Sequence, residues 1–327
     1  MKNFSIRHGK TFRDKSVSLL TLFTLGSGLS SLSAQTVVVT DQVSAQPTTD
    51  RIVPFRLSEQ GVVRPVEWGV DTAWEDEGNM RRGTAFMEQV DLVRVSLRPT
   101  DPIMDGDLGA DQKEHIQKRL KLLTFTNPDA KLTINSDHPK IDPFYKGNAQ
   151  AWAQMMDLHT RYFQEGGRKV VSVAPFNEPD YVYTGQGTRE DFYNIANELK
   201  KNPLFDNIRI CGGNTLNCDE ALPWYNFLKD RLDEGNTHQL AGGFDGYAGF
   251  FEAVRKDGKH ATADEMHNVM EAMVGLEYGL QTGIWWGSAE YARGEFCKTS
   301  RGERLAYAEH RPNWTEASVY RAPDGKV

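Results

Sequence analysis

Two glutamates, Glu178 and Glu265, each stand at or just beyond the end of a short apolar run. Residues 169–174 precede the motif Asn177-Glu178-Pro179, and residues 260–265 read His-Ala-Thr-Ala-Asp-Glu. If both runs are strands of one parallel barrel, the two carboxylates project from the same end of it. A carboxylic acid that protonates a leaving oxygen and a carboxylate that attacks an anomeric carbon are the pair that cleavage of a glycosidic bond requires.

The second of these runs also predicts which way its side chains point. Side chains alternate along a strand, so Ala261, Ala263 and Glu265 share one face, while Thr262 and Asp264 occupy the other. Two alanines leading to a glutamate are typical of a crowded inner face that opens into a pocket. We therefore expect Glu265 to point into the pocket and Asp264 to point away from it.

The elements that position these glutamates repeat along most of the chain. From about residue 66, short β-branched runs alternate with segments of helical periodicity, which is the pattern of βα units around a parallel sheet. Strands are predicted at residues 66–70, 92–97, 131–135, 169–174, 207–212, 242–247, 260–265 and 283–286. Helices are predicted at residues 111–123, 149–164, 189–201, 222–232 and 268–280. No Gly-x-Gly-x-x-Gly turn follows the first strand, which argues against an open dinucleotide-binding sheet. We expect an α/β fold, a (β/α)8 TIM barrel over residues 65–298, for which roughly 250 residues suffice.

Two segments flank the predicted barrel. Residues 35–64 are polar and rich in Thr and Val, and we expect a pre-barrel extension that contributes a strand or a plug. No closing amphipathic helix is evident after Trp286, and Pro323-Asp324-Gly325 is a turn signal that predicts another strand. We therefore interpret residues 299–327 as the start of a β-domain that continues beyond a C-terminally truncated sequence.

The first 34 residues have the order of a secretory signal peptide. Basic residues come first, an apolar stretch follows at residues 17–25, and Ser31-Leu32-Ser33-Ala34 provides small residues for cleavage. The apolar stretch is far shorter than the roughly 20 residues that span a bilayer. We expect an exported protein, secreted, periplasmic or on the cell surface, with no membrane span after cleavage.

Charge and cysteine content restrict the partners further. The formal net charge of -7 would repel nucleic acid, so no nucleic-acid partner is expected. Cys211, Cys218 and Cys297 are too scattered for a disulfide framework or a zinc ribbon. Free buried thiols are expected, with a Cys211 to Cys218 bridge as the alternative.

Asn177-Glu178-Pro179 after the fourth predicted strand, with Glu265 ending the seventh, resembles the clan A glycoside hydrolases, a superfamily of retaining TIM-barrel enzymes. The resemblance covers residues 66–286. It implies that Glu178 is the acid/base, that Glu265 is the nucleophile, and that Asn177 holds the 2-hydroxyl of the reacting sugar. It also implies a carbohydrate substrate and no metal or organic cofactor.

Other positions match the same superfamily. Arg94, in the second strand, resembles the arginine that keeps the nucleophile ionised, with Arg98 as the competing candidate. Tyr247 stands where clan members place a tyrosine against the nucleophile, although the histidine expected two residues before it is missing. Of the two tryptophans that end the eighth strand, Trp285 is assigned as the stacking platform for the sugar, in preference to Trp286.

Residues at the remaining strand ends are candidates for substrate contacts, and a loop cap or a turn hydrogen bond is the alternative role of each. They are Asp71, Trp74, Asp137, His138 and Asn214.

Two other functions stay open on the sequence alone. His260, Asp264, Glu265 and His267 are a possible ligand set of a metal-dependent TIM-barrel hydrolase. That interpretation lacks a His-x-His on the first strand and leaves the Asn-Glu-Pro motif without a role. The other is a non-catalytic carbohydrate-binding barrel, which would gain nothing from burying paired charges.

The hydrolase interpretation requires the two glutamates to differ in protonation. Repulsion between the carboxylates is expected to raise the pKa of Glu178, so that it holds a proton for the leaving group. Arg94 is expected to lower the pKa of Glu265.

Overall fold

The computed structural model describes residues 56–327, except 73–75 and 138–139. The predicted signal peptide at 1–34 and most of the predicted extension at 35–64 lie outside the described residues, as do Trp74 and His138. The described residues all belong to one compact unit.

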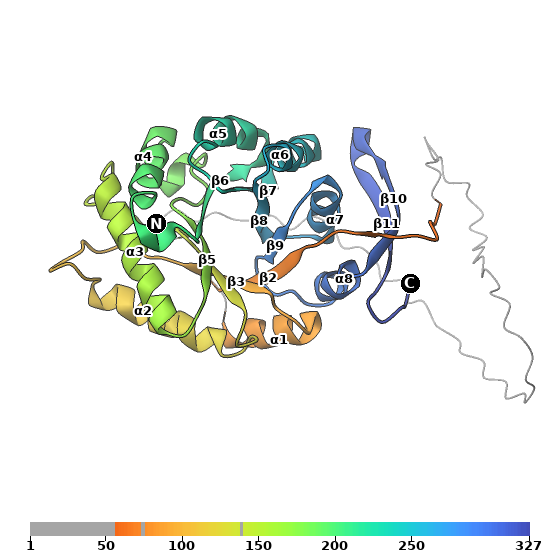
Figure 1. The fold of residues 1–327 in the computed structure, drawn as a ribbon, viewed down its shortest axis with the longest axis horizontal. Helices are drawn as coiled ribbons and strands as arrows, with labels where there is room; N and C mark the ends of the chain where they lie inside the picture. The colour runs from red at the N-terminus through yellow and green to blue at the C-terminus, as the bar shows by residue number, and fades with distance from the viewer. Residues whose placement is uncertain (1–55, 73–75, 138–139) are drawn as a thin grey trace, which may run out of the picture. The chain divides into compact units, whose positions relative to one another are not determined.

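Within the described residues, eight parallel strands close into a barrel in chain order, inside a ring of helices (Figure 1). The strands are β2 (Glu67–Asp71), β3 (Leu92–Ser96), β4 (Lys131–Asn135), β5 (Val170–Ala174), β6 (Arg209–Asn217), β7 (Glu234–Ala241), β8 (His260–Met266) and β9 (Thr282–Trp285). The predicted (β/α)8 TIM barrel is confirmed, and the expected strands overlap the observed ones everywhere except at the sixth.

The sixth barrel strand is β7, so the prediction of a strand at 242–247 is wrong. Strand β7 ends at Ala241, Gly242 follows it with a φ of 89°, and residues 244–247 begin helix α6 (Phe244–Lys256). The first five residues of β7 are buried although four of them are Glu, Gly, Asn and His. A run with so little apolar character gives no signal of a buried strand, because here the barrel interior is polar.

The helices follow the strands in the βα order. They are α1 (Glu77–Met87), α2 (Ala110–Leu123), α3 (Ala149–Glu165), α4 (Arg189–Leu199), α5 (Ala221–Leu228), α6, α7 (Val269–Tyr278) and α8 (Ala292–Ser300), with short 3-10 turns η1 (Val182–Thr184), η2 (Pro203–Phe205), η3 (Cys218–Glu220) and η4 (Arg311–Asn313). Helix α8 follows the last barrel strand, contrary to the expectation that no helix does so. It packs Phe296 against Trp68, with ring centroids 5.9 Å apart, and so covers β2.

A three-stranded antiparallel sheet lies outside the barrel. It is ordered β1 (Val62–Val63), β10 (Glu303–His310) and β11 (Thr315–Arg321), and β10 and β11 lie beside α7 and α8 (Figure 1). The Phe296 and Tyr320 rings, 5.7 Å apart, pack this sheet onto α8. The segment before the barrel and the segment after it thus pair with each other.

Cys211, Cys218 and Cys297 are all free and buried, as expected. None of the described helices combines the length and the apolar character that crossing a membrane requires.

Candidate active site

Polar side chains from six barrel strands converge at the C-terminal end of the barrel, where TIM-barrel enzymes place their chemistry. They are Arg94 on β3, Asn135 on β4, Asn177 and Glu178 after β5, Asn214 on β6, His238 on β7, and Asp264 and Glu265 on β8.

Arg94 is the centre of this group and is fully buried. Its Nη1 lies 3.1 Å from Oε2 of Glu265 and also contacts Asp71, while its Nε lies 3.2 Å from Oδ2 of Asp264. Its Nη2 donates a hydrogen bond of 2.8 Å to Oδ1 of Asn177. One guanidinium therefore positions both Glu265 and the asparagine that precedes Glu178.

Arg98, the competing candidate, is positioned elsewhere. Its backbone N–H faces Nε2 of His159 at 3.4 Å, and its carbonyl accepts a hydrogen bond from Gln112. Arg94 is the arginine beside Glu265.

Glu178 is held by its backbone as well as by its side chain. Its φ of 50° lies in the left-handed region, which a non-glycine residue adopts at a cost on the order of 1 kcal/mol. Its N–H donates a 2.8 Å hydrogen bond to the carbonyl of Asn214, itself at a φ of 47°. This fixed turn aims the carboxylate so that Oε1 lies 3.2 Å from Nδ1 of His238.

His238 connects the two ends of the site and was missed in the sequence. It is fully buried, and its Nε2 lies 2.8 Å from Oδ1 of Asp264, while Nδ1 lies 3.7 Å from Oε2 of Glu265. Burial alone would lower the pKa of His238, but Glu265, Asp264 and Glu178 together raise it well above the usual value. The raised pKa favours an imidazolium at His238, which would donate to both Asp264 and Glu178. His238 lies on β7, the strand that was predicted at residues 242–247, after its observed position.

Asp264 and Glu265 contact the same guanidinium although they are consecutive. The pairing of β8 with β9 shifts register between Ala263 and Met266, and this irregularity breaks the alternation of side chains. Asp264 lies inside the barrel, with its Oδ2 3.4 Å from Nδ2 of Asn214. The expectation that Asp264 points away from Glu265 is wrong for this reason.

The pKa values of the two glutamates are opposite to those expected. Burial raises the pKa of Glu265 to about 7, against the lowering effects of His238 and Arg94, and its Oε2 accepts no hydrogen bond from the described residues. Burial would also raise the pKa of Glu178, but the hydrogen bond and charge of His238 hold it below the usual value. These two shifts favour a proton on Glu265 and a charge on Glu178.

The tryptophan assignment from the sequence is also wrong. Trp285 is 0% exposed, stacks on Trp68 at 6.3 Å and donates to Sγ of Cys297, so neither face is open to a sugar. Trp286 is 38% exposed and stacks on His267 with ring centroids 5.4 Å apart. Because Trp286 lies one residue further along the chain, it leaves the barrel wall and reaches the mouth.

Tyr247 does not lie at a strand end. It is fully buried within α6 and packs against Phe244 and Phe251, with no hydrogen-bond partner for its hydroxyl among the described residues. The assignment beside the nucleophile followed from the misplaced sixth strand. On the observed strand, the position two residues after His238, where the resemblance would place the tyrosine, is occupied by Leu240.

Asp137 borders the site. One of its carboxylate oxygens lies 3.5 Å from Nη1 of Arg94, and burial raises its pKa to about 6. Asn177 and Asn214 both lie within the site, whereas His138 falls outside the described residues.

A metal ion was one alternative from the sequence. The predicted ligands are not together, because His260 begins β8 and lies 2.8 Å from Oγ1 of Thr282, at the opposite end of the strand from His267. Within the described residues, Glu178, His238 and Glu265 do have metal-like spacing, with one ligand atom of each within 4.8 Å of the others. The guanidinium of Arg94, 3.1 Å from Glu265, would repel a divalent cation at this position.

No family model matches the chain, and no protein of curated function matches its sequence. Solved structures do match. A GH30 endoxylanase from Clostridium papyrosolvens C71 is similar with a TM-score of 0.59 and 14% identity, over 82% of this chain and 82% of that one. The endo-β1,6-glucanase BT3312 gives 0.55 and 12%, over 85% and 86%. The endoglucanase Cel5A from Pseudomonas stutzeri gives 0.50 and 12%, over 71% and 95%. At such low identity these matches establish a shared fold.

Proposed function

We propose that this chain is a glycoside hydrolase that cleaves O-glycosidic bonds of a poly- or oligosaccharide by a retaining double displacement. The observation that carries the proposal is the convergence of Glu178 and Glu265, which have one carboxylate oxygen each within 4.8 Å of the other. Retaining glycosidases hold their two carboxyl groups about 5–5.5 Å apart, whereas inverting enzymes need about 6.5–9.5 Å to admit a water molecule.

The similar solved structures support the same class of reaction. They are an endoxylanase, an endo-β1,6-glucanase and an endoglucanase. All three act on polysaccharides, and the resemblance of Asn177-Glu178-Pro179 and Glu265 to clan A glycoside hydrolases agrees with them.

Each side chain then has a defined task. Glu265 attacks the anomeric carbon, with Arg94 at 3.1 Å stabilising its charged form. Glu178 gives a proton to the leaving oxygen and afterwards takes one from water, while Asn177, oriented by Arg94, binds the 2-hydroxyl. Trp286 is the surface on which the sugar ring stacks.

The proton that the first step needs is stored beside Glu178. Nδ1 of His238 lies 3.2 Å from Oε1 of Glu178, so transfer across this hydrogen bond gives a protonated Glu178 and a neutral His238 that Asp264 still holds. Glu265 must lose its own proton before it attacks, and this proton passes to the neutral Nδ1 of His238, 3.7 Å from Oε2 of Glu265, which restores the imidazolium. Because these groups titrate together, the pKa values of activity belong to the group rather than to single residues.

The decisive experiment compares wild type with Glu178→Gln and Glu265→Gln on xylan, β-1,6-glucan and carboxymethyl cellulose, with reducing ends as the readout. We expect turnover on one of them, a loss of about 10²–10⁴-fold in the acid/base variant, and a larger loss in the nucleophile variant. Proton NMR of the first product should show the anomeric configuration of the substrate.

Azide separates the two roles. In Glu178→Ala, azide should attack the glycosyl intermediate and give a product of retained configuration, whereas in Glu265→Ala it should replace the nucleophile and give the inverted one. Glu234→Gln, a buried glutamate at the other end of the barrel, is the control. Inverted products from wild type would overturn the retaining mechanism, and binding without turnover would favour a non-catalytic carbohydrate-binding barrel.

We also propose that the chain is exported, because residues 1–34 have the order of a signal peptide. Mass spectrometry of the mature protein should find an N-terminus close to Gln35. An intact leader on a protein that stays inside the cell would contradict export without affecting the proposed reaction.

A further inference from the structure

The segment that follows Glu178 exposes apolar surface at the mouth of the barrel. Tyr181, Val182 and Tyr183 are 46%, 79% and 82% exposed. The two tyrosine rings lie 5.2 Å apart at an interplanar angle of 59°. A contiguous exposed apolar surface of this kind marks a binding surface more often than an isolated exposed side chain does.

This segment is anchored at its beginning. The N–H of Tyr181 and the hydroxyl of Thr184 both donate to the carbonyl of Glu178, at 3.0 and 3.1 Å. The carboxylate of Asp180 accepts hydrogen bonds from the N–H groups of Leu216 and Asn217, at 2.8 and 2.9 Å. The tyrosines are therefore fixed relative to Glu178 and to the end of β6.

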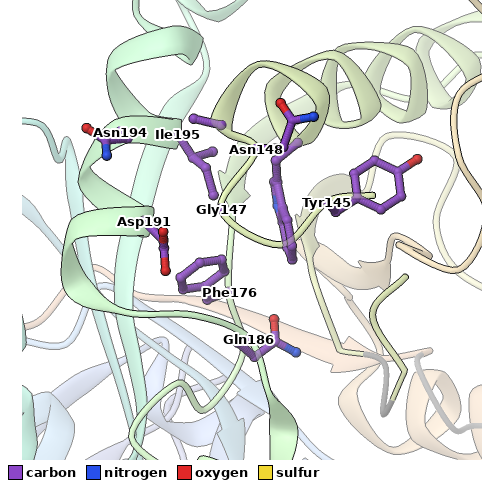
Figure 2. A pocket seen from close by; sticks show the side chains of 10 residues that line it. Tyr145, Gly147, Asn148, Phe176, Gln186, Asp191, Asn194 and Ile195 are labelled. Carbon is purple, nitrogen blue, oxygen red and sulfur yellow. The ribbon is translucent and has the colours of Figure 1, made fainter. Parts of the chain in front are cut away.

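Its other end is anchored as well. Gln186 is buried and donates a 3.0 Å hydrogen bond to the carbonyl of Ser136, and Figure 2 shows its side chain beside Phe176 in the cavity between α3 and α4. A Cβ at Gly187 would lie only 2.7 Å from Cζ of Phe176, so the backbone runs directly against the core. An exposed segment held at both ends binds a ligand without the cost of ordering a flexible loop.

From this arrangement we propose that Tyr181, Val182 and Tyr183 form the binding platform for the leaving-group side of a glycan chain. The inference rests on the proposed function, because it takes Glu178 as the residue that protonates the leaving oxygen. A sugar attached to that oxygen lies on the Glu178 side of the bond, and the next units reach the residues that follow Glu178. Tyrosine rings offer flat apolar faces on which pyranose rings stack.

The position of Trp286 extends the inference to the substrate class. Trp286 follows β9, and the platform follows β5, four strands away in a barrel of eight. Aromatic surface therefore borders the site on opposite sides, beside the nucleophile strand and beside the acid/base. Such a site binds sugar on both sides of the cleaved bond, so the substrate is an oligo- or polysaccharide rather than a glycoside with a small leaving group.

The test compares two substrates that differ in their leaving groups. One is whichever of xylan, β-1,6-glucan or carboxymethyl cellulose the wild type hydrolyses, and the other is the matching xylobiosyl, gentiobiosyl or cellobiosyl fluoride, whose leaving group is a single atom. In a Tyr181→Ala/Tyr183→Ala variant we expect kcat/KM on the polysaccharide to fall about tenfold or more. On the glycosyl fluoride it should stay within about twofold, because the fluoride leaves the platform empty.

Two controls make the result specific. Phe227→Ala removes an exposed aromatic side chain from α5 and should change neither rate. Tyr181→Phe/Tyr183→Phe keeps the ring faces and should restore the polysaccharide rate. An equal loss on both substrates would overturn the inference, since the segment would then act only through the position of Glu178, and so would an unchanged polysaccharide rate. A wild type that turns over neither substrate would overturn the proposed function itself.

Discussion

The two ends of the barrel bury charge in opposite ways. At the N-terminal ends of the strands, Arg209 pairs with Glu234 at 2.6 Å, and Thr262 adds a 2.5 Å hydrogen bond to the same glutamate. At the C-terminal ends, the guanidinium of Arg94 lies within 4 Å of four carboxylates, those of Asp71, Asp137, Asp264 and Glu265. A carboxylate with its own cation stays ionised and stabilises the fold. Where one cation is shared among several carboxylates, not all of them are fully neutralised, and some can take up or release a proton.

Glu234 and Glu265 show what this difference does to the same side chain. Both are buried. Burial opposes ionisation of Glu234, yet Arg209 and the hydrogen bond from Thr262 hold its pKa below the usual value. Burial raises the pKa of Glu265 to about 7, and the nearby charges of Asp137 and Glu178 add to this rise against the lowering effects of His238 and Arg94. Perturbed pKa values of this kind are typical of functional sites.

The largest expected effect is that of Arg94→Met. It leaves several buried carboxylates without their cation and should destabilise the protein by about 3–5 kcal/mol in urea unfolding. Turnover should fall by roughly 10³-fold or more, because both the charge on Glu265 and the orientation of Asn177 depend on Arg94. Arg94→Lys restores a charge without the planar fork, so it should recover much of the stability but little of the activity.

Arg209→Met is the matched change at the opposite end. Its partner Glu234 keeps the hydrogen bond from Thr262, and the side chain of Arg209 is partly exposed. We expect a smaller loss of stability and a kcat that stays within about twofold of wild type. A comparable loss of activity in the two methionine variants would refute the distinction between a structural end and a catalytic end.

A smaller effect appears in the pH dependence of stability. The folded-state pKa of Glu265 is raised to about 7, so this residue contributes stability that is present below its unfolded pKa and lost as the pH rises through 7. Glu265→Gln should therefore gain stability relative to wild type as the pH rises from 4.5 to 8, by an amount on the order of 3 kcal/mol.

Glu234→Gln should show the opposite sign. Its folded-state pKa is lowered, so Glu234 contributes stability that is present above the unfolded pKa and lost in acid. The variant should be destabilised at neutral pH, with a penalty that shrinks below pH 4.5. Urea titrations of both variants and of wild type from pH 4 to 8 measure these changes in the free energy of unfolding. If the two variants showed the same pH dependence relative to wild type, the contrast between Glu234 and Glu265 would be contradicted.

Local pattern was sufficient where a strand has an apolar face. Residues 92–97 and 169–174 show this pattern, and both strands were predicted at the right place, as was the strand that carries Glu265. The pattern failed at β7, whose residues Asn236, Thr237 and His238 are buried because polar partners from other strands meet them. No property of this segment taken alone reveals those partners.

The sequence by itself determined the order of strands and helices and the placing of two glutamates at strand ends, because both depend on residues that are near one another in the chain. Only the tertiary structure decided that His238 joins them, that a register shift turns Asp264 inward, and that Trp286 rather than Trp285 is exposed. It also decided the order of the pKa values of Glu178 and Glu265. Burial and electrostatic interaction are sums over groups that folding brings together from distant parts of the chain.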